Sequence, residues 1–89
     1  MIERSLEITN KKGLHARAAA KLINLTHNFQ SDVYISKGDN EVNGKSILGL
    51  LMLAAHQGTW VTVKVEGNDE DTALESICEL INGKFQENE

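Results

Sequence analysis

Apolar and polar residues alternate along three stretches of the chain with the period of two that is typical of half-buried β-strands. In chain order, the apolar members are Ile2, Leu6 and Ile8, then Val33 and Ile35, then Val61, Val63 and Val65. The first stretch predicts a strand over residues 2–8. The middle stretch runs through turn residues 37–40 into a return strand at 41–43, so it predicts a hairpin. The pattern therefore gives four strands.

Two other stretches repeat core-facing residues three or four positions apart, which is the spacing of one helix face. They are Ala19, Leu22, Ile23 and Thr26, in a helix from Ala16, and Ala73, Leu74, Ile77, Leu80 and Ile81. The continuous apolar run 47–55, which follows Ser46, predicts a short helix between them. Asn68 or Asp69 is placed to cap the last helix. The order βαββαβα predicts an α+β fold, with three helices on one face of a four-stranded antiparallel sheet.

Size and charge narrow the function classes. The 89 residues suffice for one domain, and nine Lys and Arg against thirteen Asp and Glu give a net charge of -4, which argues against nucleic-acid binding. A single cysteine, Cys78, cannot pair within the chain and fits a reducing compartment. No apolar segment reaches the ~20 residues that a membrane span needs. We expect a cytoplasmic monomer without membrane insertion.

His15 stands just before the predicted first helix, in the run Gly13-Leu14-His15-Ala16-Arg17. The first backbone N–H groups of a helix lack intrahelical partners and can bind an anion. The helix dipole and Arg17 disfavour imidazolium, so we predict a largely neutral, nucleophilic ring. The N–H groups of Ala16, Arg17 and Ala18, with the Arg17 guanidinium, would stabilise a phosphoryl group on it. Spacing alone leaves open that His15 is a surface turn residue and Arg17 a solvated charge.

Residues 13–17 closely resemble the phosphorylation site of HPr, the histidine-containing phosphocarrier family of the bacterial phosphotransferase system. The resemblance extends to Gly-Lys-Ser-Ile-Leu-Gly-Leu at 44–50, to Glu-Gly-Asn-Asp-Glu at 66–70, and to the length and element order. It implies an open-faced β-sandwich, with a single HPr-like domain over residues 1–89 and a structured core at about 1–85.

The resemblance also implies a phosphoryl carrier rather than an enzyme, with no cofactor. His15 would accept a phosphoryl group on Nδ1, as pros-phosphohistidine, from phospho-Enzyme I. It would pass the group to Enzyme IIA domains of sugar transport or to their regulatory counterparts, with help from Arg17. The family motif usually continues with Pro where this chain has Ala18. Ala18 adds an N–H to the anion site but leaves the turn less rigid than Pro would.

Ser46 is placed to cap the second helix by accepting a bond from the amide of residue 48 or 49, and capping alone accounts for a serine here. In related proteins the equivalent serine is phosphorylated by HPr kinase/phosphorylase, and Lys45-Ser46-Ile47 resembles that site. A phosphate at a positive helix end would stabilise the helix, so its effect should fall on docking.

The run 47–55 is apolar on more than the one face that a core requires. Ile47, Leu48, Leu51 and Met52 are therefore candidates for a contact surface with Enzyme I, on whose edge a Ser46 phosphate would lie. The alternative, that these side chains fill the core, stays open for some of them.

Other motifs in the sequence give no support for a nucleotide or metal site. Gly44-Lys45-Ser46 lacks the glycine spacing of a nucleotide-binding P-loop. His15, His27 and His56 have no metal-ligand spacing, so no metal site is expected. The competing function class is a small αβ module that binds an effector or regulates another protein without phosphoryl transfer.

Overall fold

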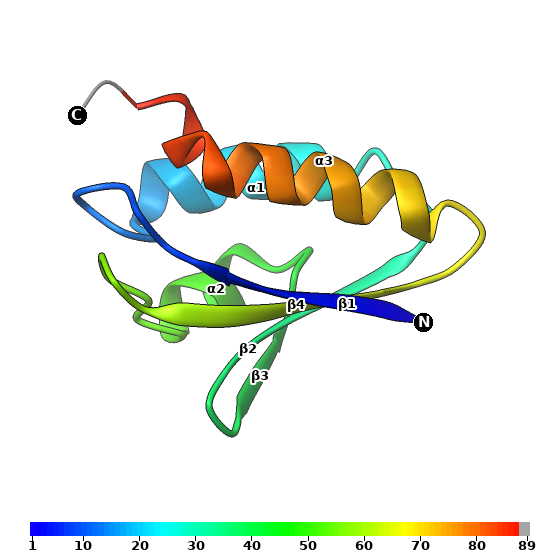
Figure 1. The fold of residues 1–89 in the computed structure, drawn as a ribbon, viewed down its shortest axis with the longest axis horizontal. Coiled ribbons are helices and arrows are strands. Elements are labelled where there is room, and N and C mark those ends of the chain that lie inside the picture. Colours follow the sequence, from blue (N-terminus) through cyan, green and yellow to red (C-terminus); the bar gives the residue numbers. More distant parts are fainter. Residues whose placement is uncertain (88–89) are drawn as a thin grey trace.

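The computed structural model describes residues 1–87, and its elements follow the order predicted from the sequence pattern (Figure 1). The strands are β1 (Ile2–Glu7), β2 (Asp32–Lys37), β3 (Asn40–Asn43) and β4 (Trp60–Glu66). The helices are α1 (Ala16–Thr26), α2 (Ile47–Met52) and α3 (Glu70–Asn82), followed by a single short turn, η1 (Lys84–Gln86). All neighbouring strands are antiparallel, in the order β1-β4-β2-β3.

Alternation along the strands separates the two faces of the sheet, as the pattern predicts. One face is apolar and buried; its side chains include Leu6, Val33, Ile35, Val61, Val63 and Val65. On the opposite face Ser5 and Thr62 pair across β1 and β4, with their hydroxyl oxygens 3.1 Å apart. The sheet therefore has one packed face and one polar face.

Helices α1 and α3 lie side by side along the buried face of the sheet, and α2 packs against α1 and β3 (Figure 1). The buried stripe of α3 contains Ala73, Leu74, Ile77, Cys78 and Ile81, whereas Leu80 is only partly buried. Burial raises the pKa of the Cys78 thiol, as expected for a packed side chain. The α+β class and the open-faced sandwich are confirmed.

Helix α2 is shorter than the apolar run that predicts it. It ends at Met52 because the last amides turn back on carbonyls only three residues earlier: Leu53 N donates to Leu50 O at 3.3 Å and Ala54 N to Leu51 O at 3.2 Å. Ala54 then takes a positive φ of 52°. The chain leaves the helix axis here, so Leu53 becomes buried without a further helical turn.

Asp69 occupies the N-cap position of α3, but its side chain does not cap that helix. Its carboxylate accepts hydrogen bonds from the backbone amides of Gln30 and Ser31, at 2.9 and 3.0 Å, and from the Ser31 hydroxyl. The prediction of a side-chain cap is wrong at this residue because the loop before β2 offers three donors to one carboxylate. These bonds hold the pKa of Asp69 below its ordinary value.

Candidate functional site

His15 is the N-cap residue of α1, with extended backbone angles of φ -81° and ψ -178°, and its side chain makes no cap hydrogen bond. The first bond of the helix runs from Ala19 N to His15 O, at 2.8 Å. The amides of Ala16, Arg17 and Ala18 have no acceptor within residues 1–87. The positive end of the helix therefore presents three unpaired N–H groups beside the ring, an arrangement that favours an anion.

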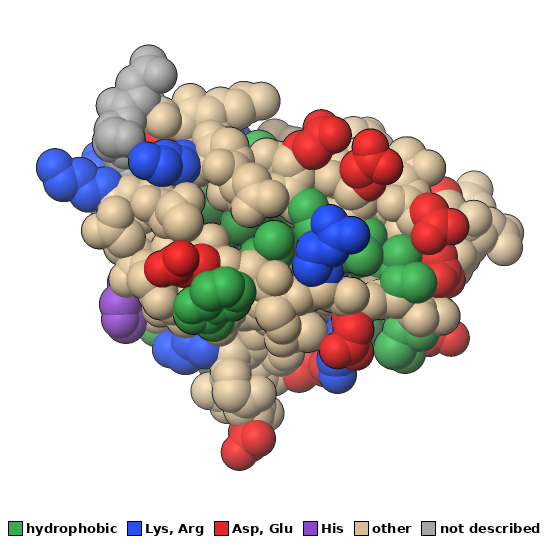
Figure 2. Space-filling model, viewed as in Figure 1, with side chains coloured by type: hydrophobic (Ala, Val, Ile, Leu, Met, Phe, Trp, Pro, Cys, Tyr) green, Lys and Arg blue, Asp and Glu red, His purple; other side chains and the backbone are tan. Residues whose placement is uncertain are grey.

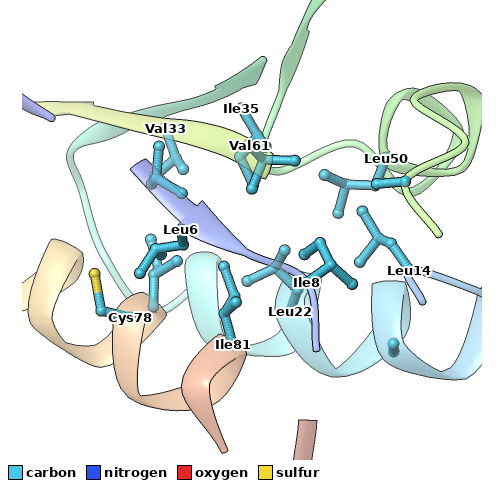
Figure 3. Close-up of a cluster of buried hydrophobic side chains, with 14 of the residues drawn as sticks. Leu6, Ile8, Leu14, Leu22, Val33, Ile35, Leu50, Val61, Cys78 and Ile81 are labelled. Carbon is cyan, nitrogen blue, oxygen red and sulfur yellow. The ribbon is translucent and has the colours of Figure 1, made fainter. Parts of the chain in front are cut away.

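The backbone before His15 is fixed by the loop that follows α2. Gly13 has a φ of +67°, and a Cβ there would lie 2.6 Å from both Ala55 O and His56 Cα. Leu14 N donates to Ala55 O at 2.8 Å. The Leu14 side chain is buried and points toward Ile8 and Leu50 (Figure 3). His15 is thus held at the helix start by two preceding residues. Gly13 has a backbone conformation that favours glycine, and Leu14 is anchored in the core.

The imidazole borders a small surface depression of about 260 Å³, which is lined by Lys12, Leu14, His15, Ala54, Ala55 and His56. The His15 side chain is 27% exposed, so the ring lies at the surface and not in the apolar interior. Lys and Arg side chains gather over the β1–α1 loop, where Lys11 and Lys12 are both exposed (Figure 2). Lys12 also lines the depression, so it brings positive charge to its edge.

Arg17 does not line the depression. It is exposed and makes no hydrogen bond or ion pair with other residues in the range 1–87. The structure thus brings the Arg17 amide to the helix start without bringing its guanidinium into a bonded contact. Its predicted assistance to the phosphoryl group remains a prediction.

The C-terminal tail supplies two site contacts that the sequence pattern did not indicate. Nε2 of His15 lies 2.6 Å from Oε2 of Glu87, whose side chain is only 10% exposed. The other oxygen, Oε1, accepts a hydrogen bond from Asn10 Nδ2 at 3.0 Å. Asn10 is fully buried, and Nδ2 also donates to Gly13 O at 2.7 Å. Asn10 and Glu87 are separated by most of the chain, so no local signal connects them.

Ser46 caps α2, as predicted: its Oγ accepts a hydrogen bond from Gly49 N at 3.1 Å. The segment before it is tied to the end of α1. Lys45 Nζ donates to Phe29 O at 2.8 Å, and the Thr26 hydroxyl donates to Gly44 O at 2.9 Å. The Ser46 side chain is partly exposed.

Four large apolar side chains of α2 stay at the surface. Their exposed fractions are 45% for Ile47, 66% for Leu48, 38% for Leu51 and 73% for Met52. Leu50 alone in this helix is buried. The alternative that these four side chains fill the core is therefore wrong, and a contiguous exposed apolar surface follows Ser46.

Residues 1–87 contain no cluster of three or more His, Cys, Asp or Glu side chains arranged to hold a metal ion. The helices within the same range are too short or too polar to cross a bilayer.

Comparisons with known proteins show which family this chain resembles. Residues 2–83 match a family model described as the phosphorylation site of the HPr component of the phosphotransferase system. Phosphocarrier protein HPr of Neisseria meningitidis is 48% identical over 89 residues, covering both chains completely. An HPr structure from Thermoanaerobacter tengcongensis, 40% identical, covers both chains completely with a TM-score of 0.96. An HPr dimer from the same organism, 41% identical, covers 98% of this chain and 100% of its own, with a TM-score of 0.79.

Proposed function

This chain belongs to the HPr family of phosphocarriers of the phosphotransferase system, and from that premise we propose that His15 is the residue that carries the phosphoryl group. The observation that carries this proposal is the surface imidazole beside three unpaired amides at the start of α1. Those amides and the helix dipole favour a dianionic group on the ring. Phosphoryl transfer gives this arrangement a direct chemical role, which a regulatory module without phosphoryl transfer does not require.

We further propose that the group is carried on Nδ1 and comes from phospho-Enzyme I. The Nδ1 lone pair forms the new N–P bond while the donor's bond to phosphorus breaks, and that electron pair returns to the donor. The amides of Ala16, Arg17 and Ala18 and the Arg17 side chain then share the negative charge. The chain forms a covalent intermediate but converts no substrate of its own, so it acts as a carrier and not as an enzyme.

The apolar surface of α2, defined by Ile47, Leu48, Leu51 and Met52, is the proposed docking surface for Enzyme I and for the Enzyme IIA domains or regulatory counterparts that receive the group. Its exposure supports this role, since apolar side chains left at the surface favour burial against a partner. Depression and docking surface are joined by the turn after α2, which carries Ala54 and Ala55.

Ser46 is the proposed regulatory site for an HPr kinase/phosphorylase. Its hydroxyl already accepts a bond at the positive end of α2, so a phosphate there would keep that interaction and strengthen it. The same phosphate would place two negative charges at the edge of the α2 surface and oppose burial against Enzyme I. Regulation would therefore act on docking, with the fold intact.

We also propose that residues 1–89 act as one domain, and that the protein works in the cytoplasm as a monomer without a cofactor. The oligomeric state is a distinct question, since an HPr structure that resembles this chain is a dimer. Sedimentation across a range of protein concentrations tests it, and a dimer at micromolar concentration would refute the monomer.

The decisive experiment is intact-mass analysis after incubation with phosphoenolpyruvate and Enzyme I. The wild-type protein should gain one acid-labile phosphoryl group, and His15→Ala should gain none. His56→Ala, which changes another histidine of the same depression, should still gain it. A second arm with ATP and an HPr kinase should give an acid-stable phosphate that is lost in Ser46→Ala. An unmodified wild-type protein in the first arm would refute the carrier assignment to His15.

A further inference from the structure

Glu87 touches the ring nitrogen opposite the one proposed to carry phosphate. Nε2 of His15 and Oε2 of Glu87 are 2.6 Å apart, and both side chains are at least partly shielded from water. A carboxylate has no proton to donate, so the hydrogen bond requires that Nε2 be the N–H group. A neutral ring protonated at Nε2 keeps its lone pair on Nδ1.

Residues 84–86 are fixed in a conformation that places the Glu87 carboxylate beside His15. Phe85 is fully buried, and its carbonyl accepts a hydrogen bond from Lys21 Nζ at 2.7 Å. Lys84, Phe85 and Gln86 all have positive φ, at 57°, 54° and 62°. Non-glycine residues keep such angles only where the surroundings impose them, and such segments are common at functional sites. The turn reverses the chain after α3 and carries Glu87 toward α1.

Asn10 fixes the second oxygen of the carboxylate. Its Nδ2 bridges Glu87 Oε1 and Gly13 O, and the side chain is fully buried in the β1–α1 loop. Asn10, Glu87 and His15 thus form a chain of hydrogen bonds in which a buried amide orients the carboxylate and the carboxylate orients the imidazole. This is the order in which an orienting carboxylate sets the tautomer of a reactive histidine.

We propose that Glu87 is a positioning residue that holds His15 in its Nε2–H tautomer, so that Nδ1 remains the nucleophile. The inference rests on the proposed phosphorylation of His15, and it explains why Nδ1, and not Nε2, is the ring nitrogen that reacts. With the proton on Nδ1, the lone pair of Nε2 would face the carboxylate and the nucleophilic atom would be blocked.

The contact serves both halves of the transfer. When the Nδ1–P bond forms, the Nε2 proton stays on the ring and the positive charge that develops there faces Glu87. When the group leaves, the electrons of the N–P bond return to Nδ1, and the ring departs as neutral imidazole because Nε2 is protonated. Without that proton it would have to leave as an imidazolate anion, which is a far poorer leaving group.

The test compares Glu87→Ala and Glu87→Gln with Glu75→Ala, which removes an exposed acid from α3. Long-range ¹H–¹⁵N correlation spectra of the unphosphorylated protein report which ring nitrogen of His15 carries the proton. Single-turnover phosphorylation by phospho-Enzyme I then gives the rate at saturating donor and the donor concentration at half-maximal rate. Amide spectra establish that each variant is folded.

Wild type and Glu75→Ala should show the Nε2–H form. Glu87→Ala should lower the ratio of Nε2–H to Nδ1–H about tenfold, since a hydrogen bond to a charged group is lost. Its saturating rate should fall with little change in the half-maximal concentration, and Glu87→Gln, which keeps an acceptor oxygen, should lie between. A tautomer ratio within twofold of wild type in Glu87→Ala, or an Nδ1–H ring in wild type, would overturn the positioning role even if phosphorylation proceeds. Failure of wild type to be phosphorylated would instead refute the proposed function.

Discussion

The close approach of Gly13 to the loop after α2 allows a matched pair of substitutions. Gly13 and Gly38 both have positive φ, at +67° and +59°, so alanine at either site carries the same left-handed penalty of about 1–2 kcal/mol. At Gly38 a new Cβ would meet no atom within 4 Å. At Gly13 it would lie 2.6 Å from Ala55 O and from His56 Cα, both backbone atoms that cannot rotate away. Overpacking of this kind adds about 1–3 kcal/mol.

Gly13→Ala should therefore be less stable than Gly38→Ala by at least about 1 kcal/mol, which corresponds to a Tm about 4–8 °C lower for a domain of this size. Urea unfolding followed by circular dichroism, with thermal scans alongside, measures the difference. Gly13→Ala should also slow phosphorylation of His15, because the displaced loop carries the helix start, whereas Gly38→Ala should leave that rate unchanged. Equal urea midpoints for the two variants would refute the steric argument. An unchanged phosphorylation rate in Gly13→Ala would refute the link between this loop and the site.

Three further predictions address the other anchors of the fold. Ser46→Ala removes the α2 cap and should cost about 1 kcal/mol of unfolding free energy in urea, whereas Ser46→Asp, which keeps an acceptor at the cap, should lose less. The pKa of Asp69 is lowered in the folded protein, so its bonds to the Gln30–Ser31 loop stabilise the fold above about pH 4 and lose that effect as the pH falls further. Urea midpoints between pH 2 and 7 should decline less on acidification for Asp69→Asn than for wild type, and parallel curves would contradict this role. Phe85→Ala empties a fully buried site and should cost about 3–5 kcal/mol while shifting the His15 ring signals, since the tail that carries Glu87 would be released. Unshifted ring signals would indicate that Glu87 is held independently of Phe85.

Local periodicity was enough to predict the four strands, the three helices and the helix start at His15. These features depend on signals within short stretches of sequence. Examples are the alternation of Val61, Val63 and Val65 with polar residues, and the cap that Ser46 forms with the amide of Gly49, three residues later. The early end of α2 was missed because apolar residues continue past it, whereas the shift to bonds between residues three apart and the positive φ of Ala54 leave no mark in the pattern.

The contact between Glu87 and His15 could not be predicted from the hydrophobic pattern of the sequence. It depends on the left-handed turn at Lys84–Gln86, and Lys, Phe and Gln carry no signal for that conformation. It also joins residues that are distant in sequence, through a tail beyond the predicted core limit near residue 85. The Asp69 side chain illustrates the same limit, because the donors that draw it from α3 lie in the loop before β2.

Strand β4 is central to the sheet and pairs with both β1 and β2, yet it is the last strand along the chain. Ile2 pairs with Val65, so forming the β1–β4 pairing closes a loop that spans about 70% of the chain. A chain still emerging from the ribosome can therefore form α1 and the β2–β3 hairpin early, but β1 has no neighbour until residues 60–66 are available. Such long-range pairing slows folding relative to chains rich in local contacts, and we expect β1 and the hairpin to join into one sheet only once β4 is available.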